Sequence, residues 1–557
     1  MRRLAIIVAS LALSGCVTPA ATTESDTARF ADFSYSGNDP EFATPLASGQ
    51  YRNPVLAGFH PDPSVVQVGQ DYYLTNSTFG FYPGLPVYHS RDLVNWTQIG
   101  NAIDRPDMLD FTGVNLGNNG IYAPAIEHRD GTFYIITTCV ACGGNFVVTA
   151  SDPEGPWSDP IWLPHIEGID PSIFFDDDGR TYIVHHRNPA VQKTPDHTAL
   201  WVMEVDSETF APLSEDTMVV DGATPAPWHT EYIEGPHLYK IDGKYILSAP
   251  GGGTGYYHGQ LAYRADSPFG PYEANPDNPF LTQLGLPDDR QWPVTSTGHG
   301  DMVRGPDGRW WIVFLGVRPY DLTTPPQDPG RFHTGRETFL LPVDWVDGWP
   351  RVVKDRPVPL VAKGPSLEAP AITGNFTVED RFDGAELAPQ WLMARTPGER
   401  WWALGSDGLA LAARAQRIGD RVQPSWIGRR IAHKNAVIES TLTVLPATGA
   451  EAGLLAAQND ENYLAFGLSR NGAGDVIARV RRRSGEDDPR GIVVGQRVVP
   501  AAPSYRLLVE ITEGRADFVL LIDGDSIVIA SDVDASPLTT AKAGGFTGAM
   551  IGPYAER

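Results

Sequence analysis

The chain has 557 residues, which is too many for one ordinary hydrophobic core, so two globular domains and a tail are expected. Its 68 acidic residues outnumber 43 Lys and Arg residues, and the net charge of −25 argues against nucleic acids and anionic membrane surfaces as partners. Plentiful Gly, Pro and aromatic residues between short hydrophobic runs are typical of a chain built from many strands and turns.

Residues 1–16 have the pattern of an export signal. Arg2 and Arg3 precede an apolar run over residues 4–13, which is too short to span a bilayer. The run ends in Leu-Ser-Gly-Cys, which resembles a bacterial lipobox, so we expect Cys16 to be acylated and to hold the protein at a membrane by lipid alone. The alternative is a plain secretory signal in which Cys16 stands by chance.

The residues that follow Cys16 suggest where the exported protein goes. Val17 is not the acidic residue that keeps bacterial lipoproteins at the inner membrane, so we expect an outer-membrane lipoprotein facing the periplasm or the cell surface. Residues 17–48 are rich in Ala, Thr, Ser and Asp, and this composition predicts a flexible tether without a fold of its own.

Residues 49–360 contain a phrase that recurs five times: a small polar or acidic residue, two apolar residues, a turn, then an aromatic and aliphatic strand. The five copies begin at Asp62, Ala123, Asp170, Glu234 and His299. Each copy predicts a hairpin, and a spacing of roughly 45 to 65 residues is the length of a four-stranded propeller blade. The repeat therefore predicts a five-bladed β-propeller.

Between the first and third copies lie Cys139 and Cys142, the only cysteines besides Cys16. One Cys-x-x-Cys pair cannot supply four zinc ligands, and no second pair exists. In an oxidising compartment a local disulfide is the expected state, in preference to a redox role.

The first strand of each propeller blade lines the central axis, so the residues that open the copies should meet at one end of the channel. Three carboxylates and a histidine would then face one another. An Asp-Pro-Ser turn that caps its own backbone explains each aspartate alone, but not the recurrence of acids at one blade position.

Paired carboxylic acids can hydrolyse a glycosidic bond, one protonating the leaving oxygen and the other acting on the opposite face of the sugar. Asp62 and Glu234 belong to the first and fourth blades and lie across the ring, a separation that suits a water molecule and predicts inversion. Asp170 is a third acid, whose negative charge would raise the pKa of Glu234 and keep it protonated.

Four motifs now carry a family resemblance, and they occur in the family's order over residues 49–350. They are Phe59-His60-Pro61-Asp62-Pro63-Ser64, Ile169-Asp170-Pro171-Ser172, Ile233-Glu234-Gly235-Pro236-His237 and Gly298-His299-Gly300-Asp301. The chain resembles glycoside hydrolase family 43, and residues 77–84 with 92–96 resemble its β-xylosidase and α-L-arabinofuranosidase branches.

The resemblance implies a role for each motif residue. Asp62 would be the general base, Glu234 the general acid, and Asp170 the residue that tunes and orients the acid. Arg336, in Gly-Arg-Glu-Thr, would reach the substrate, although a surface arginine beside a strand is the alternative. His299 would contact the sugar or, as in some relatives, ligate a calcium-centred water cluster; a lone histidine permits calcium without requiring it, and no cofactor is required.

Four aromatic residues are expected to form apolar walls against sugar faces: Phe79, Phe81, Tyr82 and Tyr122. The alternative for each is a place in the blade core. Tyr122 stands where relatives often carry tryptophan, so the subsites would differ in detail from those relatives.

The repeat stops after residue 360, and residues 361–373 read as a Pro- and Ala-bearing linker. Residues 374–557 alternate apolar and polar positions in short runs, which predicts a β-sandwich of the jelly-roll kind. Its ending resembles the concanavalin-like domain of many β-xylosidases in the family, which closes one side of the pocket. A carbohydrate-binding module is the alternative, but no surface row of aromatic residues is evident.

Together these features predict an all-β, inverting exo-glycosidase that releases xylose from β-1,4-xylooligosaccharides or arabinoxylan fragments, with α-L-arabinofuranosidase activity on the same site. An enzyme that acts mainly on arabinofuranosides is the nearest alternative. A non-catalytic sugar-binding lipoprotein is more remote, because a binder has no need for an acid and a base on opposite faces. The sequence leaves the oligomeric state open.

Overall fold

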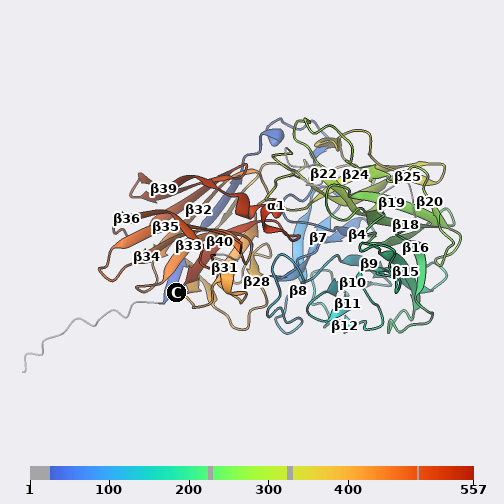
Figure 1. Ribbon diagram of the computed structural model, residues 1–557, viewed down its shortest axis with the longest axis horizontal. Helices are drawn as coiled ribbons and strands as arrows, with labels where there is room; N and C mark the ends of the chain where they lie inside the picture. The colour runs from blue at the N-terminus through green and yellow to red at the C-terminus, as the bar shows by residue number, and fades with distance from the viewer. Residues whose placement is uncertain (1–25, 224–229, 323–329, 486–487) are drawn as a thin grey trace, which may run out of the picture.

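A computed structural model describes residues 26–223, 230–322, 330–485 and 488–557, and in this part of the chain nearly all regular structure is β-strand. Two domains lie side by side: a propeller of strands β4 to β25, except β6, and a sandwich that holds most later strands (Figure 1). The predicted signal and Cys16 lie outside the described residues. Within those residues, none of the helices has the length and apolar character needed to cross a membrane.

The propeller has five blades, each an antiparallel sheet whose strands follow the order of the chain, as the repeat predicts. The first blade contains β4 (Ser64–Val68), β5 (Asp71–Thr75), β7 (Gly84–Ser90) and β8 (Thr97–Ile103). The second contains β9 (Ala125–Arg129), β10 (Thr132–Cys139), β11 (Gly144–Ala150) and β12 (Ile161–Trp162). The third contains β13 (Ile169–Phe175), β14 (Thr181–Arg187), β15 (Ala199–Val205) and β16 (Thr217–Asp221). In the last two blades the strands are β17 (His237–Ile241), β18 (Lys244–Gly251), β19 (Gly259–Ala265) and β20 (Glu273–Ala274), with β21 (Leu281–Thr282) beside β19; and β22 (Thr295–Arg304), β23 (Trp310–Val317), β24 (Glu337–Val346) and β25 (Trp349–Arg351).

Contacts between the fifth and first blades close the ring. The carboxylate of Asp301, on β22, accepts hydrogen bonds from the Ser64 hydroxyl at 2.8 Å and the Val65 amide at 2.9 Å, both on β4. Beyond the blades, β3 (Gln50–Arg52) pairs with β26 (Val361–Lys363), so the predicted linker begins with a strand. Cys139 and Cys142 form a disulfide at the end of β10.

Two large antiparallel sheets form the sandwich, with one apolar core between them. One sheet contains β1 (Thr27–Phe30), β2 (Phe33–Gly37), β27 (Thr377–Asp380), β29 (Trp402–Gly405), β30 (Gly408–Ala412), β32 (Asn435–Val444), β37 (Tyr505–Thr512), β38 (Arg515–Ile522) and β39 (Asp525–Asp534). The other contains β6 (Phe81–Tyr82), β28 (Leu392–Ala394), β31 (Ser425–Arg430), β33 (Glu451–Asn459), β34 (Asn462–Arg470), β35 (Val476–Ser484), β36 (Ile492–Val499) and β40 (Met550–Glu556). The helical elements are short: η1 (Pro40–Phe42), η2 (Ile418–Asp420), η3 (Ser536–Leu538) and α1 (Thr540–Ala543).

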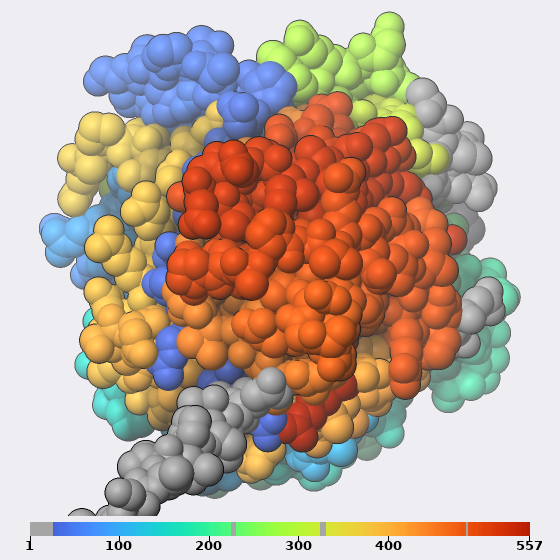
Figure 2. Space-filling model, turned by 90° about the vertical axis from the view of Figure 1, so that its left-hand side faces the viewer, coloured from blue at the N-terminus to red at the C-terminus, as the bar shows by residue number. Residues whose placement is uncertain are grey.

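The prediction of an unfolded tether over residues 17–48 is wrong for residues 26–48. Strands β1 and β2 pair with β32 in the middle of a sandwich sheet, and in Figure 2 blue atoms of this early segment lie beside orange atoms of the C-terminal domain. The physical reason is an alternation of apolar side chains: Ala28, Phe30, Phe33 and Tyr35 are all buried in the sandwich core. The sandwich therefore takes two of its strands from before the propeller.

The same N-terminal segment is also fixed by charge. The buried guanidinium of Arg318 pairs with Asp39 at 2.8 Å, with Glu41 at 3.2 Å and with Glu337 at 2.7 Å. Because Glu337 follows Arg336 directly, this network ties the N-terminal segment and the propeller together next to a predicted site residue. Isolated buried ions are costly, so these groups stabilise the fold only as a set.

Candidate active site

The residues just before the first strand of each blade can be aligned by strand pairing. The alignment agrees with the predicted equivalence except at the fourth blade. Ser64, Ser172, His237 and Asp301 begin the regular pairing of their strands with the second strand of each blade. The residues two positions earlier are therefore equivalent: Asp62, Asp170, Gly235 and His299. Glu234 lies one residue before the equivalent position, which is occupied by Gly235.

Backbone conformation explains this offset. Asp62, Asp170 and His299 have φ of 50°, 52° and 47°, and Gly235 has φ of 47° at the same place. These left-handed values are strained for residues with a side chain and tend to occur at functional sites. A Cβ on Gly235 would lie 2.4 Å from Nε2 of His299, so glycine makes room for the histidine and moves the acid to the preceding position.

Asp62 is held as a carboxylate by its neighbours. Its Oδ1 accepts a 2.9 Å hydrogen bond from Nη1 of Arg336 and its Oδ2 accepts a hydrogen bond from the Ser77 hydroxyl. Burial alone would raise the pKa of Asp62, but Arg336, His299 and the Ser77 hydrogen bond lower it below the usual 3.8. Asp62 is therefore ionised at neutral pH and able to accept a proton. Arg336, a predicted site residue, therefore lies beside Asp62 in the structure, a contact that the sequence did not indicate.

Glu234 has the opposite electrostatic environment. Burial and the charge of Asp62 raise its pKa to about 7, against the lowering effect of Arg336. The pKa of Asp170 is also raised well above its usual value, by burial and by the charges of Glu234 and Asp62. Burial is thus the first cause of the shift at Glu234, where the sequence had suggested the charge of Asp170. Two acids this close resist losing both protons, so a proton remains available near neutral pH.

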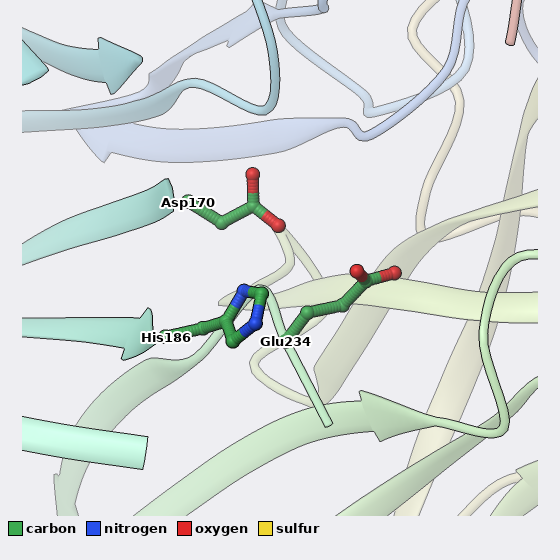
Figure 3. A group of neighbouring side chains, drawn as sticks. All are labelled: Asp170, His186 and Glu234. Carbon is green, nitrogen blue, oxygen red and sulfur yellow. The ribbon is translucent and has the colours of Figure 1, made fainter. Parts of the chain in front are cut away.

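His186 is a third member of this acidic cluster and was missed in the sequence. Figure 3 shows it at the end of β14, beside the carboxyl groups of Asp170 and Glu234, and the possible ligand atoms of the three residues lie within 4.8 Å of one another. Burial and the nearby His185 and His299 lower the pKa of His186 to about 4, so its ring is neutral at pH 7. A neutral ring can hydrogen-bond to either acid without adding a charge that would lower the pKa of Glu234.

We expect His186→Leu to lower kcat roughly 10- to 100-fold, because the acid loses a polar neighbour that fixes its position. The apolar side chain also deepens the desolvation of Glu234, so the alkaline limb of the pH–rate profile should move to higher pH. His186→Asn keeps a polar group, so its kcat should lie between those of His186→Leu and the parent enzyme. An unchanged profile in His186→Leu would show that His186 has no part in positioning the acid.

His299 would be the single protein ligand of the water-held calcium ion that the family resemblance allows. In the described part of the chain, one group of three potential ligands converges, and it consists of Asp170, His186 and Glu234 without His299. His299 has Asp62 as a neighbour, at 3.5 Å from Nδ1 to Oδ1. Burial lowers the pKa of His299 to about 4, so it faces Asp62 as a neutral ring.

These residues line a small pocket of about 100 Å³ at the end of the propeller axis. Its lining residues are Asp62, Phe79, Tyr122, Ala123, Ile169, Asp170, Glu234, Thr254, His299, Arg336 and Phe546. Of the predicted aromatic walls, Phe79 and Tyr122 line the pocket. Phe81 and Tyr82 do not, because they form β6, which pairs with β28 at the edge of a sandwich sheet. Their rings pack in apolar clusters, so that part of the prediction is wrong.

Phe546 is the contribution of the sandwich to the pocket, in agreement with a closing role for this domain. Its ring stacks on Phe79 with centroids 5.7 Å apart, and its backbone oxygen lies 3.4 Å from Nη2 of Arg336. The chain around Phe546 packs closely against the propeller, because a Cβ on Gly335 would lie 2.7 Å from the Gly548 backbone. No local pattern in the sequence could identify Phe546, because its neighbours in the pocket belong to the other domain.

We expect Phe546→Ala to lower kcat/KM by roughly tenfold, equivalent to about 1.4 kcal/mol of lost contact with the sugar. The backbone contact to Arg336 remains in this variant, so the loss should fall mainly on KM. Val498→Ala, at an exposed position of the same domain, is the matched control. Equal kinetics for both variants would contradict a role for Phe546 in substrate binding.

Comparisons with known proteins agree with this geometry. Residues 51–350 match the family model of glycosyl hydrolases family 43, and residues 379–557 match the beta xylosidase C-terminal Concanavalin A-like domain. The first match covers the propeller and the second covers most of the sandwich.

Individual relatives resemble the chain over nearly its whole length. It is 36% identical to the non-reducing end alpha-L-arabinofuranosidase BoGH43B of Bacteroides ovatus, over 92% of each chain. It is 34% identical to a xylosidase/arabinosidase of Butyrivibrio fibrisolvens, over 90% of this chain and 95% of the relative. The crystal structure of a GH43_12 protein retrieved from capybara gut metagenome has a TM-score of 0.87 and 34% identity, covering 95% of this chain and 99% of that one.

Proposed function

We propose that this chain, which belongs to glycosyl hydrolases family 43 and is an exo-acting glycosidase, releases xylose from the non-reducing end of β-1,4-xylooligosaccharides with inversion of configuration. We also propose that arabinofuranose is cleaved from arabinoxylan fragments at the same site. The observation that carries the proposal is the opposite electrostatic tuning of two acids in one pocket, with Asp62 held ionised and the pKa of Glu234 raised to about 7.

The size of the pocket supports exo action. About 100 Å³ between the propeller axis and Phe546 suits one terminal sugar better than the interior of a polymer. Family 43 glycosidases generally work without a cofactor, and the proposed reaction needs none.

In the proposed reaction, Asp62 takes a proton from a water molecule as the water oxygen bonds to the anomeric carbon. The bond from that carbon to the leaving oxygen breaks, and Glu234 gives this oxygen its proton. Arg336 keeps Asp62 ionised until water is bound. Burial and the charge of Asp62 keep Glu234 protonated, and Asp170 and His186 lie beside it.

Preference for an arabinofuranoside is the second candidate, favoured by the name of the Bacteroides ovatus relative. Xylopyranosides and arabinofuranosides present similar hydroxyl patterns, so the same acid and base can serve both. Parallel hydrolysis of 4-nitrophenyl β-D-xyloside and 4-nitrophenyl α-L-arabinofuranoside measures the ratio of kcat/KM. A ratio strongly in favour of the arabinofuranoside would replace the first candidate with the second.

We further propose that the protein is an outer-membrane lipoprotein anchored through Cys16. The support is the lipobox-like Leu-Ser-Gly-Cys and the non-acidic Val17 after it. Mass spectrometry of the membrane fraction should find acyl chains on an N-terminal Cys16, and Cys16→Ala should release the protein from that fraction. Recovery of the parent protein in the cytosol would refute the proposal.

A further inference from the structure

A second and larger cavity lies between the two domains, with a volume of about 370 Å³. Propeller residues around His60 and Trp96 form one side, and sandwich residues of β27 and β31 form the other. It shares no lining residue with the catalytic pocket. The size is within the range of pockets that bind small organic ligands.

Two adjacent arginines, Arg429 and Arg430, line this cavity at the end of β31. Both are half-buried, and burial lowers the pKa of each. Arg430 donates through Nε to the backbone oxygen of Phe59 at 2.6 Å, while its Nη2 is buried without a hydrogen-bond partner in the described structure. Arg429 lies over the ring of Trp391, at 5.6 Å from the centroid.

Neither arginine has a carboxylate partner among the described residues. Asp380 is the acid that acts electrostatically on Arg429, but its two oxygens accept hydrogen bonds from the Phe382 amide and the Trp391 indole. For Arg430, burial lowers the pKa and the phenol of Tyr88 acts in the opposite direction, without a carboxylate.

Four of the buried arginines pair with carboxylates, whereas Arg52 and Arg483 have backbone oxygens as partners. Arg336 pairs with Asp62, Arg395 with Asp460, Arg481 with Glu451, and Arg318 with three acids. A chain with a net charge of −25 has ample acids for such pairing. Arg429 and Arg430 are instead two half-buried guanidinium groups in one cavity without a carboxylate, and Nη2 of Arg430 has no acceptor in the described structure. Because a buried donor without an acceptor is costly, this pair indicates an anion from outside the chain.

Aromatic side chains in the same cavity indicate that the anion is attached to a ring. Tyr88 and Trp96 line it from the propeller, and Tyr35 and Phe376 line it from the sandwich. Such faces pack against sugar rings, and neutral polar groups lie among them, including His60, whose Nε2 is 2.9 Å from the Tyr88 hydroxyl. An inorganic anion would need neither the aromatic faces nor this volume.

We propose that the interdomain cavity is a second carbohydrate site that binds a uronic acid, with Arg429 and Arg430 holding the carboxylate and the aromatic side chains packing against the sugar ring. Planar guanidinium groups suit a carboxylate because they can donate two parallel hydrogen bonds. The site is independent of which pentose the catalytic pocket releases.

Isothermal titration of the full chain with D-glucuronate, D-glucose and sodium sulfate tests the proposal. Glucuronate should bind, and glucose and sulfate should each bind at least tenfold more weakly, since each lacks one half of the recognised structure. Arg429→Met, which keeps an unbranched apolar stem and removes the charge, should weaken glucuronate binding at least tenfold while hydrolysis of an aryl xyloside is unchanged. Glucuronate at saturating concentration should not compete with the aryl xyloside.

The proposal would be overturned by an absence of glucuronate binding or by equal binding to Arg429→Met. Competition with the substrate would also overturn it, because it would place glucuronate in the catalytic pocket. Equal affinity for sulfate would also overturn it, because the site would then recognise charge alone. If Arg429→Met loses hydrolytic activity through misfolding, Ala57→Phe provides the second test, since it reduces the cavity and leaves both arginines in place. Undiminished glucuronate binding by Ala57→Phe would place the ligand elsewhere.

Discussion

Glu234→Gln should lower kcat on xylobiose by about 10³-fold, within the range attributed to a general acid. Glutamine has nearly the same shape but no proton to give to the leaving oxygen. The loss should shrink to about tenfold on 2,4-dinitrophenyl xyloside, because that leaving group departs without protonation. Steady-state kinetics on the two substrates, with Glu208→Gln at an exposed turn as the control, measure the difference.

The pH dependence of the parent enzyme follows from the same residue. The acid must be protonated, so kcat/KM should fall as pH rises through about 7, the pKa of Glu234. The base must be ionised, and its pKa lies below 3.8, so activity should be retained down to acidic pH. If the residual activity of Glu234→Gln still falls over the same alkaline pH range, a group other than Glu234 is the general acid.

Asp62→Asn should lower kcat by about 10³-fold or more, because asparagine cannot take the proton from water. It should also lower the free energy of unfolding by about 3 kcal/mol, since the buried Arg336 loses the carboxylate at 2.9 Å. A third consequence separates this variant from a merely destabilised one. The charge of Asp62 raises the pKa of Glu234, so the alkaline limb of the residual activity should move to a pH below 7.

Asp71→Asn is the matched control, because Asp71 pairs with His89 and Arg91 at the partly exposed surface. It should leave the pH–rate profile in place. An Asp62→Asn variant whose alkaline limb does not move would contradict the electrostatic coupling between the base and the acid.

The propeller and three of its acids could be predicted because the information is local and repeated. Each copy carries its own turn and its own pair of apolar strands, so five copies give the blades without any knowledge of how they meet. The offset at Glu234 was not visible in this way, because the glycine of Glu-Gly-Pro is explained only by the approach of His299 across the axis.

Other features depend on contacts between distant segments. Phe546 reaches the pocket only after the sandwich docks on the propeller. His186 lies near Asp170 within one blade, but it meets Glu234 only after two blades pack. The first two strands of the sandwich are a different case. Their alternation of Ala28, Phe30, Phe33 and Tyr35 was present in the sequence, but the polar composition around it favoured a tether. Phe81 and Tyr82 were assigned to the sugar because nothing local indicates that β6 joins the sheet of another domain.

The central claim is a single displacement in which Asp62 and Glu234 act on opposite faces of the sugar. The most direct test follows the anomeric protons of xylose by NMR in the first minutes of xylobiose hydrolysis, with Glu234→Gln and Asp62→Asn alongside. We expect α-xylose to be the first sugar released by the parent enzyme, and we expect both variants to lose this release. Initial release of β-xylose would contradict the account, since retention requires a covalent intermediate and a different role for Asp62.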